Sequence, residues 1–437
     1  MSVTELEQNI DMDRVGEQMY DLMRELYPIC RSITGEGFRQ TQDILKQHVP
    51  LQIRAVPTGT EVFDWTVPKE WNIRDAYVKD PDGEKVIDFQ KSNLHVVNYS
   101  VPVNQKMSLE DLAKHLFTLP EHPEWIPYRT SYYEEDWGFC LSHNDYLRLK
   151  EGMYEVVIDS TLEDGHLNYG EYFKRGRSPD EVLVTTHACH PSLCNDNLSG
   201  IVVTTLLAKY LAERDTRYSY RFLFMPGGIG SIVWLCLNED KVFAIKHGLT
   251  VACVGDSGNF TYKKSRDGAL EIDQAVQNVL RHSEREHKVI DFSPYGYDER
   301  NFGSPGFNLP VGSLTRSTHS QFGGYHSSAD NFDLVKPQYL AESFGLYLAV
   351  VYLLENNRRY LNLKPKGEVQ LGKRGLYGML GGLQERTISE MASLWVLNLS
   401  DGDHSLLDIS DKSDIRFEIV KNAADILLEH GLLKEIT

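Results

Sequence analysis

The sequence has little positive charge and few cysteines, and both shortages exclude classes of protein. It carries 45 Lys and Arg residues against 63 Asp and Glu residues, which gives a net charge of −18. A general positive field that would hold a nucleic acid or an anionic membrane is therefore not expected. Six cysteines in 437 residues are too sparse for a small disulfide framework. We expect neither a nucleic acid nor a membrane as a partner.

Targeting and membrane-spanning features are also missing. The first residues, MSVTELEQNIDMDRVG, are acidic and lack the basic-then-apolar layout of a secretory signal. The longest apolar run near a helix, residues 344–354, is shorter than the roughly 20 residues that a bilayer requires. Two cysteines lie beside the candidate site described below, which suits a reducing compartment. We expect a soluble, cytoplasmic protein.

What the chain does have is material for several domains. Its hydrophobic content of 41% is ample for a core, and its length allows two to four domains of about 100–200 residues each. Short alternating runs broken by prolines set residues 58–175 apart, and we predict a β-rich inserted domain there. Residues 1–57 and 176–362 are predicted to form one discontinuous catalytic domain, and residues 363–437 a winged-helix-like domain.

Strands and helices alternate through most of the second half of the chain, which predicts an α/β fold. A three-layer, mostly parallel sheet covered by helices on both faces is the expected architecture. The segments read as strands are residues 182–186, 220–225, 249–255 and 309–316; those read as helices are residues 201–213, 229–238, 270–285 and 337–356. Within the insert, residues 155–160 and 166–172 alternate in polarity and are predicted to pair as a hairpin.

The last 50 residues predict three short helices and a terminal strand, the pattern of a winged helix. The candidate recognition helix, residues 414–429, holds Arg416 and Lys421 against four acidic residues. Phosphate contacts would be poorly served by this helix, so a docking or dimer role is expected in place of DNA binding. We expect the protein to be a homo-oligomer.

The stretch EVLVTTHACHPSLCNDNLSG, residues 181–200, places several potential metal ligands directly after a strand. Residues 182–186 are apolar and β-branched, and a helical pattern begins at residue 201. Open α/β sheets bind their ligands outside the carboxyl ends of the strands. Five potential ligands lie in the connecting loop: His187, Cys189, His190, Cys194 and Asp196. The alternative is a buried strand whose His and Cys only pack and hydrogen-bond.

Two more potential ligands follow later strands. Asp256 comes at the end of the strand-like residues 249–255, and His326 lies in the loop YHSSADN. Taken alone, Asp256 could cap a turn and His326 could be exposed. Together with His187 and Asp196 they give the order His, Asp, Asp, His at strand ends of one α/β unit. These donors are the kind that zinc prefers, and we predict that the four residues hold it.

These segments resemble those of a known family. THACHPSLCNDNLSG, VGDSG and YHSSADN resemble the co-catalytic zinc aminopeptidases. More closely, the chain is similar to a bacterial group of aminopeptidase-like proteins that carry a β-rich insert and a C-terminal winged helix. LYPICRSITGEGFRQT, YGYDERNFGSPGFNLPVGSLTR and AADILLEHGLLKEI match that group, so the resemblance covers nearly the whole chain. It implies a zinc-aminopeptidase-like (phosphorylase/hydrolase-like) fold and a link to biosynthesis.

The resemblance also implies roles for the ligands, and the chain departs from it at one important place. Asp196 would bridge two metals, His187 and Asp256 would complete one, and His326 would serve the other. The aminopeptidases carry a Glu-Glu pair as base and ligand, and the closer group reads Pro-Glu-Thr-Ile-Gly-Ser there. This chain has Gly227 and Gly228 instead. The second metal then keeps few ligands, so we expect one zinc ion in place of two.

Other positions depart from the pattern as well, and substitutes for the lost base are needed. Cys189 stands where an Asp normally follows the first His, and Gly324 where the closer group often has a Glu. Losing the base removes roughly 10²–10⁴-fold of rate unless another carboxylate replaces it. Asp298 and Glu299 are candidate substitutes, and we select Glu299; an exposed ion pair of Glu299 with its neighbour is the alternative.

Substrate contacts complete the predicted site. Arg300 and Arg316 are predicted to hold a substrate carboxylate, with ordinary surface charge as the alternative, and Tyr325 is predicted to line the site. His190 is an alternative ligand, while Cys189 and Cys194 are expected to pack or to orient the ligands.

The expected function is that of a metal-dependent amide or peptide hydrolase of the aminopeptidase type, a metalloprotease-like enzyme. Its substrate would be a small aminoacyl or N-acyl biosynthetic intermediate, and the insert would act as a lid that admits only small molecules. Two alternatives stay open because the Glu pair is missing. One is a non-hydrolytic, ligand-binding relative, and the other is an enzyme of acyl transfer or cyclisation.

Overall fold

The structure is a computed structural model that describes residues 10–376 and 387–436. The chain divides into two compact units, one formed by residues 12–268 and 287–344 and the other by the described parts of residues 1–11, 269–286 and 345–437. The boundary falls inside the long helix α10 (Pro337–Asn356). Within the described residues, no helix is both long and apolar enough to cross a membrane.

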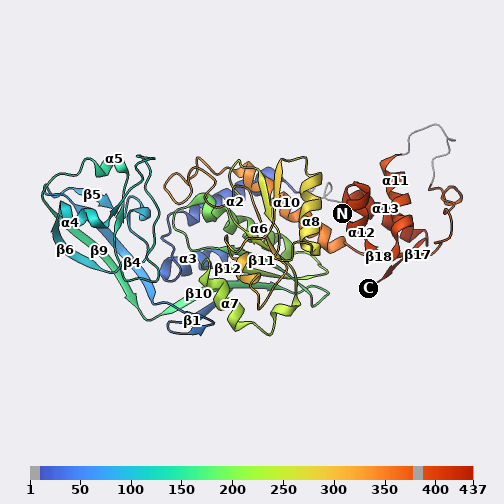
Figure 1. Ribbon diagram of the computed structural model, residues 1–437, viewed down its shortest axis with the longest axis horizontal. Coiled ribbons are helices and arrows are strands. Elements are labelled where there is room, and N and C mark those ends of the chain that lie inside the picture. The colour runs from blue at the N-terminus through green and yellow to red at the C-terminus, as the bar shows by residue number, and fades with distance from the viewer. Residues whose placement is uncertain (1–9, 377–386, 437) are drawn as a thin grey trace. The chain divides into compact units, whose positions relative to one another are not determined.

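An eight-stranded mixed sheet is the centre of the first unit (Figure 1). Its middle strands β12, β11, β13 and β16 run parallel to one another, and β1, β10 and β14 join antiparallel. Every residue of β11 and β12 is buried, as expected of parallel strands covered on both faces. The order across the sheet is β1 (Gln52–Pro57), β10 (His166–Lys174), β12 (Ser219–Met225), β11 (Glu181–His187), β13 (Ile245–Val251), β16 (Val311–Thr315), β14 (Phe260–Lys263) and β15 (His287–Ile290).

Helices cover this sheet. The buried helix α6 (Gly200–Ala212) packs on β11 and against α2 (Met12–Leu26), and α7 (Ile229–Leu237) lies on the other side of the strands in Figure 1. Two further helices of this unit are α3 (Glu36–Leu45), which contacts β10, and α9 (Glu299–Phe302), which contacts α7 and β16. The predicted α/β architecture with a helix-covered sheet is confirmed.

The inserted segment forms its own four-stranded antiparallel sheet, in the order β5 (Lys85–Asp88), β4 (Glu70–Lys79), β9 (Met153–Glu163), β6 (Val103–Ser108). The predicted hairpin between residues 155–160 and 166–172 is wrong. Strand β9 pairs with β4 and β6, whereas β10 pairs with β1 and β12 of the main sheet. Alternation alone predicts two strands, but partners distant in sequence decide the pairing.

Short elements complete this unit. The strands are β2 (Glu61–Val62), β3 (Trp65–Thr66), β7 (Leu116–Phe117) and β8 (Phe139–Cys140), and the helices are α4 (Leu109–Leu112), α5 (His143–Tyr146) and the 3₁₀ turns η1 (Asn93–His95), η2 (Ala113–His115) and η4 (Val242–Ala244).

The second unit contains the winged helix. Its sheet has the order β18 (Asp401–Ser405), β17 (Arg359–Asn362), β19 (Leu433–Ile436), and its helices are α8 (Glu271–His282), α11 (Ile388–Leu399), α12 (Leu406–Ser413), α13 (Phe417–Glu429) and the 3₁₀ turn η5 (Gly372–Arg374). The side-chain amide of Asn278 on α8 donates to Ser410 Oγ at 2.9 Å and to Asp411 Oδ1 at 2.8 Å. The three predicted helices and the terminal strand are confirmed.

Candidate metal centre

The candidate site begins at the carboxyl end of the central strand β11. His187 is the last residue of that strand, and the chain then reaches the short turn η3 (Cys194–Ser199), in which Asp196 and Asn197 have non-helical backbone angles, before α6. Asp196 lies in this turn with 1% of its side chain exposed, and the peptide bond that follows it is cis. The loop therefore carries its polar side chains to the edge of the sheet where α/β folds bind ligands.

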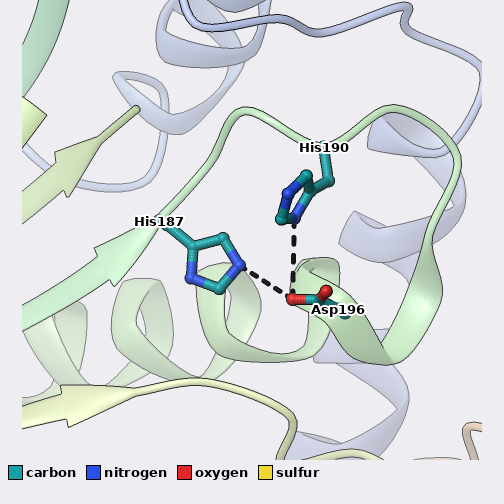
Figure 2. Close-up of side chains that lie close together, drawn as sticks. All are labelled: His187, His190 and Asp196. Atoms are coloured by element: carbon teal, nitrogen blue, oxygen red, sulfur yellow. Dashed lines mark hydrogen bonds and ion pairs between the residues drawn. The ribbon is translucent and has the colours of Figure 1, made fainter. Parts of the chain in front are cut away.

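Three histidines converge on the carboxylate of Asp196. Figure 2 shows His187 and His190 directed at the same oxygen, Oδ1, at 2.8 Å from His187 Nε2 and 3.5 Å from His190 Nδ1. The other oxygen, Oδ2, lies 3.1 Å from Nε2 of His326. The structure thus brings three of the four predicted ligands together and adds His190, which the sequence offered only as an alternative.

The donor set of this cluster fits a borderline cation such as zinc. One nitrogen each from His187 and His190 and one oxygen of Asp196 all lie within 4.8 Å of one another. His190 Nδ1 is buried, and its approach to Asp196 Oδ1 at 3.5 Å is too long for a well-formed hydrogen bond. Imidazole nitrogen and carboxylate oxygen are ordinary zinc ligands. The residues present therefore fit a cation of this kind.

The protonation states also suit metal binding. Burial raises the pKa of the Asp196 carboxyl, but His190, His187 and His326 outweigh it and hold that pKa well below its usual range. Burial lowers the pKa of His190 to about 4, although Asp196 opposes this shift. An ionised carboxylate and a neutral imidazole are the forms that bind cations.

Asp330 fixes the loop that carries Asp196. Its two carboxylate oxygens accept the backbone N–H groups of Asn195 at 2.6 Å and of Asp196 at 2.8 Å. The side-chain amide of Asn197 donates to the His187 carbonyl at 3.0 Å and so ties the loop to β11. The sequence analysis assigned no role to Asp330, although this residue lies in the motif YHSSADN. Its structural role follows from its hydrogen bonds to the loop.

Asp256 is not part of the close group that the described residues form around Asp196. Its Oδ2 accepts from the side-chain amide of Asn195 at 3.2 Å, and its Oδ1 accepts from Gly258 N–H at 3.0 Å. Asp256 is buried next to the loop, and its role as a ligand stays a prediction.

The glycine pair packs closely beside His187 at Gly227, and Asp298 contacts it at Gly228. A Cβ atom at Gly227 would be 3.3 Å from His187 Cβ and 3.6 Å from Cys189 Sγ. Asp298 Oδ1 accepts from Gly228 N–H at 2.8 Å and from Ser231 Oγ at 2.7 Å. Its Oδ2 is buried and has no hydrogen-bond partner among the described residues. A carboxylate thus lies at the loop that lacks one in the sequence.

The predicted base and substrate residues have varied surroundings. Glu299 is fully buried and forms an ion pair with Lys263. Arg316 is also buried, forms an ion pair with Glu342 and donates to Ser343 Oγ at 3.1 Å. Arg300 is partly buried in α9. Their roles in catalysis and substrate binding stay predictions.

Tyrosines surround the histidine cluster. The ring of Tyr325 stacks on His326 with centroids 4.0 Å apart, and Tyr297 stacks on His187 at 5.4 Å. Tyr128, from the inserted segment, directs its ring edge-to-face against both His190 and His326 at 5.2 Å. Apolar ring faces lower the local dielectric and strengthen electrostatic interactions inside the site.

The insert is hydrogen-bonded to the loop of His326. Tyr128 N–H donates to the His326 carbonyl at 2.8 Å, and Ser328 N–H donates to the Ile126 carbonyl at 2.8 Å. The Ser328 hydroxyl accepts from Ile126 N–H at 2.9 Å. The inserted segment therefore forms one wall of the site.

The sheet, the helices and the site loop together define an aminopeptidase-like domain. Among solved structures, the chain is similar to a zinc aminopeptidase from Bacillus subtilis, with a TM-score of 0.56 and 12% identity over 78% of this chain and 95% of that one. At this identity the likeness shows the fold alone.

Closer comparisons show the family. The chain belongs to the family described as "Domain of unknown function (DUF4910)", whose model matches residues 20–357, and residues 358–435 match a winged helix-turn-helix. A relative from Clostridium acetobutylicum, named "Putative polysaccharide biosynthesis protein with aminopeptidase-like domain", is 56% identical over 96% of both chains. The crystal structure of a "putative peptidase" from the same organism has a TM-score of 0.95 and 53% identity, over 99% of this chain and 100% of that one.

Proposed function

We propose that the protein is a metal-dependent amide hydrolase of the aminopeptidase type that acts on a small aminoacyl or N-acyl substrate. The observation that carries the proposal is the convergence of His187, His190 and His326 on Asp196. Burying a carboxylate is costly unless hydrogen bonds or positive charge compensate it, and a cation held by these residues would supply that charge. The names of the relatives, aminopeptidase-like and peptidase, support the same class of reaction.

The proposed ion is a single zinc held by Asp196, His187 and one or both of His190 and His326. Zinc would supply Lewis-acid polarisation of a substrate carbonyl group. Asp330 would keep the ligand loop in place through its two backbone hydrogen bonds. The tyrosine wall would exclude water and limit the size of the group that enters.

Two neighbouring carboxylates, Glu299 and Asp298, are the candidates for the proton acceptor. Glu299, which the sequence suggested, is held by Lys263. Asp298 keeps one oxygen without a hydrogen-bond partner among the described residues and contacts the glycine loop through the other. Glu299 Oε2 is likewise buried without a hydrogen-bond partner among the described residues, so the ion pair alone separates the two acids. It favours Asp298, because a carboxylate already in an ion pair is a weaker base.

A direct experiment measures metal and hydrolysis on the same sample. The purified protein is analysed for bound metal, then assayed on a panel of aminoacyl and N-acyl p-nitroanilides before and after chelation and after zinc is restored. We expect about one zinc per chain and a chelator-sensitive hydrolysis that zinc restores. Full zinc loading with no turnover on any member of the panel would contradict the hydrolase proposal.

A second candidate function is favoured by the glycine pair. Gly227 and Gly228 carry no carboxylate to activate water, and acyl transfer or cyclisation does not require one. In that case the zinc-loaded protein would release p-nitroaniline only when an amine acceptor is added, or would form an intramolecular product. Product analysis by mass spectrometry separates the two candidates.

A further inference from the structure

A cavity of about 610 Å³ lies at the end of the sheet opposite the metal centre. It is lined by the end of β10, the loop between β10 and β11, the first residues of β11 and β12, and the segment after α7. Glu181, the first residue of β11, lines it, whereas His187 ends that strand. At ~3.3 Å per residue the two sites are about 20 Å apart, so the cavity is separate from the metal centre.

The cavity is locally cationic although the chain as a whole is strongly acidic. Arg175, Arg177, Arg221 and Lys241 line it, against the acids Glu181 and Asp240. Arg221 is neutralised, because its Nε and Nη2 bind the two oxygens of Glu181 at 2.7 and 2.8 Å and its Nη1 forms an ion pair with Glu171. The chain as a whole has a net charge of −18. The positive charge at this cavity is therefore opposite in sign to that of the protein as a whole.

The two arginines of the loop have no acidic partner. Among the ion pairs of the described residues, none includes Arg175 or Arg177, and both side chains are exposed. Lys241 donates to a neutral group, Asn238 Oδ1, at 3.1 Å. These three positive charges outnumber Asp240, the lining acid that is not paired with Arg221, and an anion placed between them would lower their mutual repulsion.

The loop that carries the arginines is held in place before any ligand arrives. Arg177 N–H donates to the Thr216 carbonyl at 3.0 Å, and Ser178 N–H donates to the Arg217 carbonyl at 2.7 Å. Gly176 N–H donates to Ser219 Oγ at 3.0 Å. Because the backbone is fixed against the start of β12, binding an anion here costs less conformational entropy than it would on a free loop.

The lining also indicates which kind of anion fits. Guanidinium groups match phosphate with two parallel hydrogen bonds, and the volume lies in the range of about 300–1,000 Å³ that is typical of small-molecule sites. That volume is larger than a phosphate ion needs. Phe173, 43% exposed with the Arg221 guanidinium 4.7 Å from its ring centroid, offers an apolar wall for the remainder of a ligand.

From these contacts we infer that the cavity binds a phosphorylated small molecule. The phosphate lies between Arg175 and Arg177, Lys241 adds a third positive charge, and the uncharged part of the ligand lies against Phe173. The site is independent of the proposed hydrolysis, since no lining residue belongs to the metal centre.

Isothermal titration of the full-length protein tests the inference with three probes: glucose 6-phosphate, glucose as its phosphate-free match, and inorganic phosphate. We expect saturable binding of glucose 6-phosphate with a Kd of about 1 mM or tighter, weaker binding of inorganic phosphate, and none of glucose. The double variant Arg175→Gln/Arg177→Gln should bind the sugar phosphate at least about tenfold more weakly, because two charge-assisted contacts are lost. Phe173→Ala should weaken glucose 6-phosphate but leave inorganic phosphate unchanged.

The control variant is Lys364→Ala/Lys366→Ala, which removes the same charge from exposed positions far along the chain. It should bind like the wild type, and thermal unfolding of every variant checks that it is folded. The inference is overturned if the wild type gives no saturable response to either phosphate probe. It is equally overturned if the arginine variant binds as tightly as the wild type, or if the lysine control loses as much affinity as the arginine variant.

Discussion

The carboxylate of Asp298 accepts a hydrogen bond from the backbone N–H of Gly228 at 2.8 Å, which places an acid at the loop where the aminopeptidases carry a glutamate pair. The acid comes from a different part of the chain, the start of α9. Its second oxygen is buried without a hydrogen-bond partner in the described part of the chain. Asp298 is therefore a candidate to replace the acid that this loop lacks.

Replacing Asp298 by Asn tests this substitution. The variant keeps an acceptor oxygen for Gly228 and Ser231 but loses the negative charge. We expect hydrolysis to fall by roughly 10²-fold or more, with zinc content and unfolding temperature close to those of the wild type. Steady-state kinetics on the best p-nitroanilide, together with metal analysis, provide the measurement.

The matched variant is Glu299→Gln, one residue further along. Removing the partner of the buried Lys263 leaves an uncompensated charge, so we expect a loss of about 3–5 kcal/mol in the free energy of unfolding. Full activity of Asp298→Asn, together with an inactive but normally stable Glu299→Gln, would return the role of base to Glu299.

The ligand set can be resolved by comparing four variants for zinc content. Asp196→Asn should abolish zinc retention, because all three histidines are directed at this carboxylate. His190→Ala and His326→Ala should each weaken zinc binding about 10–100-fold or more, and competition with a chelator of known affinity would measure this. Asp256→Asn should have the smallest effect if the described geometry is the bound one. Zinc loss in Asp256→Asn equal to that in Asp196→Asn would support the ligand set expected from the sequence.

The sequence predicts those site residues that directly follow a strand. His187, Asp196 and His326 follow strand-like segments or lie in a polar motif, and parallel strands bring such loops to one edge of a sheet. The contributions of Asp330 and Tyr128 were not predictable in this way. Asp330 acts by accepting two backbone N–H groups more than 130 residues away in the chain, and no local pattern encodes that.

The fold shows the same division between local and distant information. Strands β9 and β10 were recognised from alternation, yet their assignment to one hairpin failed, because each strand completes a different sheet. The winged helix was recognised because three helices and a strand follow one another with ordinary helical spacing. Local patterns identify elements, and tertiary contacts decide which elements pair.

The wall that the insert contributes predicts an effect of Tyr128 on the site. Tyr128→Phe removes only the hydroxyl that contacts the Tyr132 hydroxyl at 2.8 Å, so we expect little change in activity. Tyr128→Ala also removes the ring that contacts His190 and His326, and should destabilise the protein by about 3–5 kcal/mol. It should also admit bulkier substrates. The ratio of kcat/KM for large and small acyl groups measures this, and an unchanged ratio would show that the insert does not select substrates.

Acid stability should depend on Glu70, which joins the insert to α3. Burial raises the pKa of its carboxyl, but hydrogen bonds from Arg39, Asn72 and His166 N–H bring it down to about 2 from an ordinary value of 4.5. Because the folded pKa is depressed, the stabilisation is present above about pH 4.5 and is lost as the pH falls toward 2.

The variant Glu70→Gln should therefore lower the free energy of unfolding by about 1–3 kcal/mol at neutral pH. The difference from the wild type should shrink as the pH falls below 4.5. Glu36→Gln is the control, since Glu36 also pairs with Arg39 but is 73% exposed, and exposed pairs contribute about 0–1 kcal/mol. A constant difference between Glu70→Gln and the wild type across this pH range would show that ionisation of Glu70 is not the cause.

Restoring a carboxylate at Gly227 asks whether the glycine pair is what limits hydrolysis. A Cβ at this position would lie 3.3 Å from His187 Cβ, a tight contact that a backbone shift of a few tenths of an ångström at either residue relieves, and the backbone there is not in the left-handed region. We expect Gly227→Glu to fold and to raise kcat for p-nitroanilide hydrolysis by roughly 10-fold or more, because a general base is worth about 10²–10⁴-fold when correctly placed.

Gly227→Gln and Gly227→Ala are the matched controls, since they add the same bulk or the same Cβ without a charge. If Gly227→Glu hydrolyses no faster than Gly227→Gln while binding at least as much zinc as the wild type, the missing glutamate is not the limit, and acyl transfer or cyclisation becomes the better account of this site.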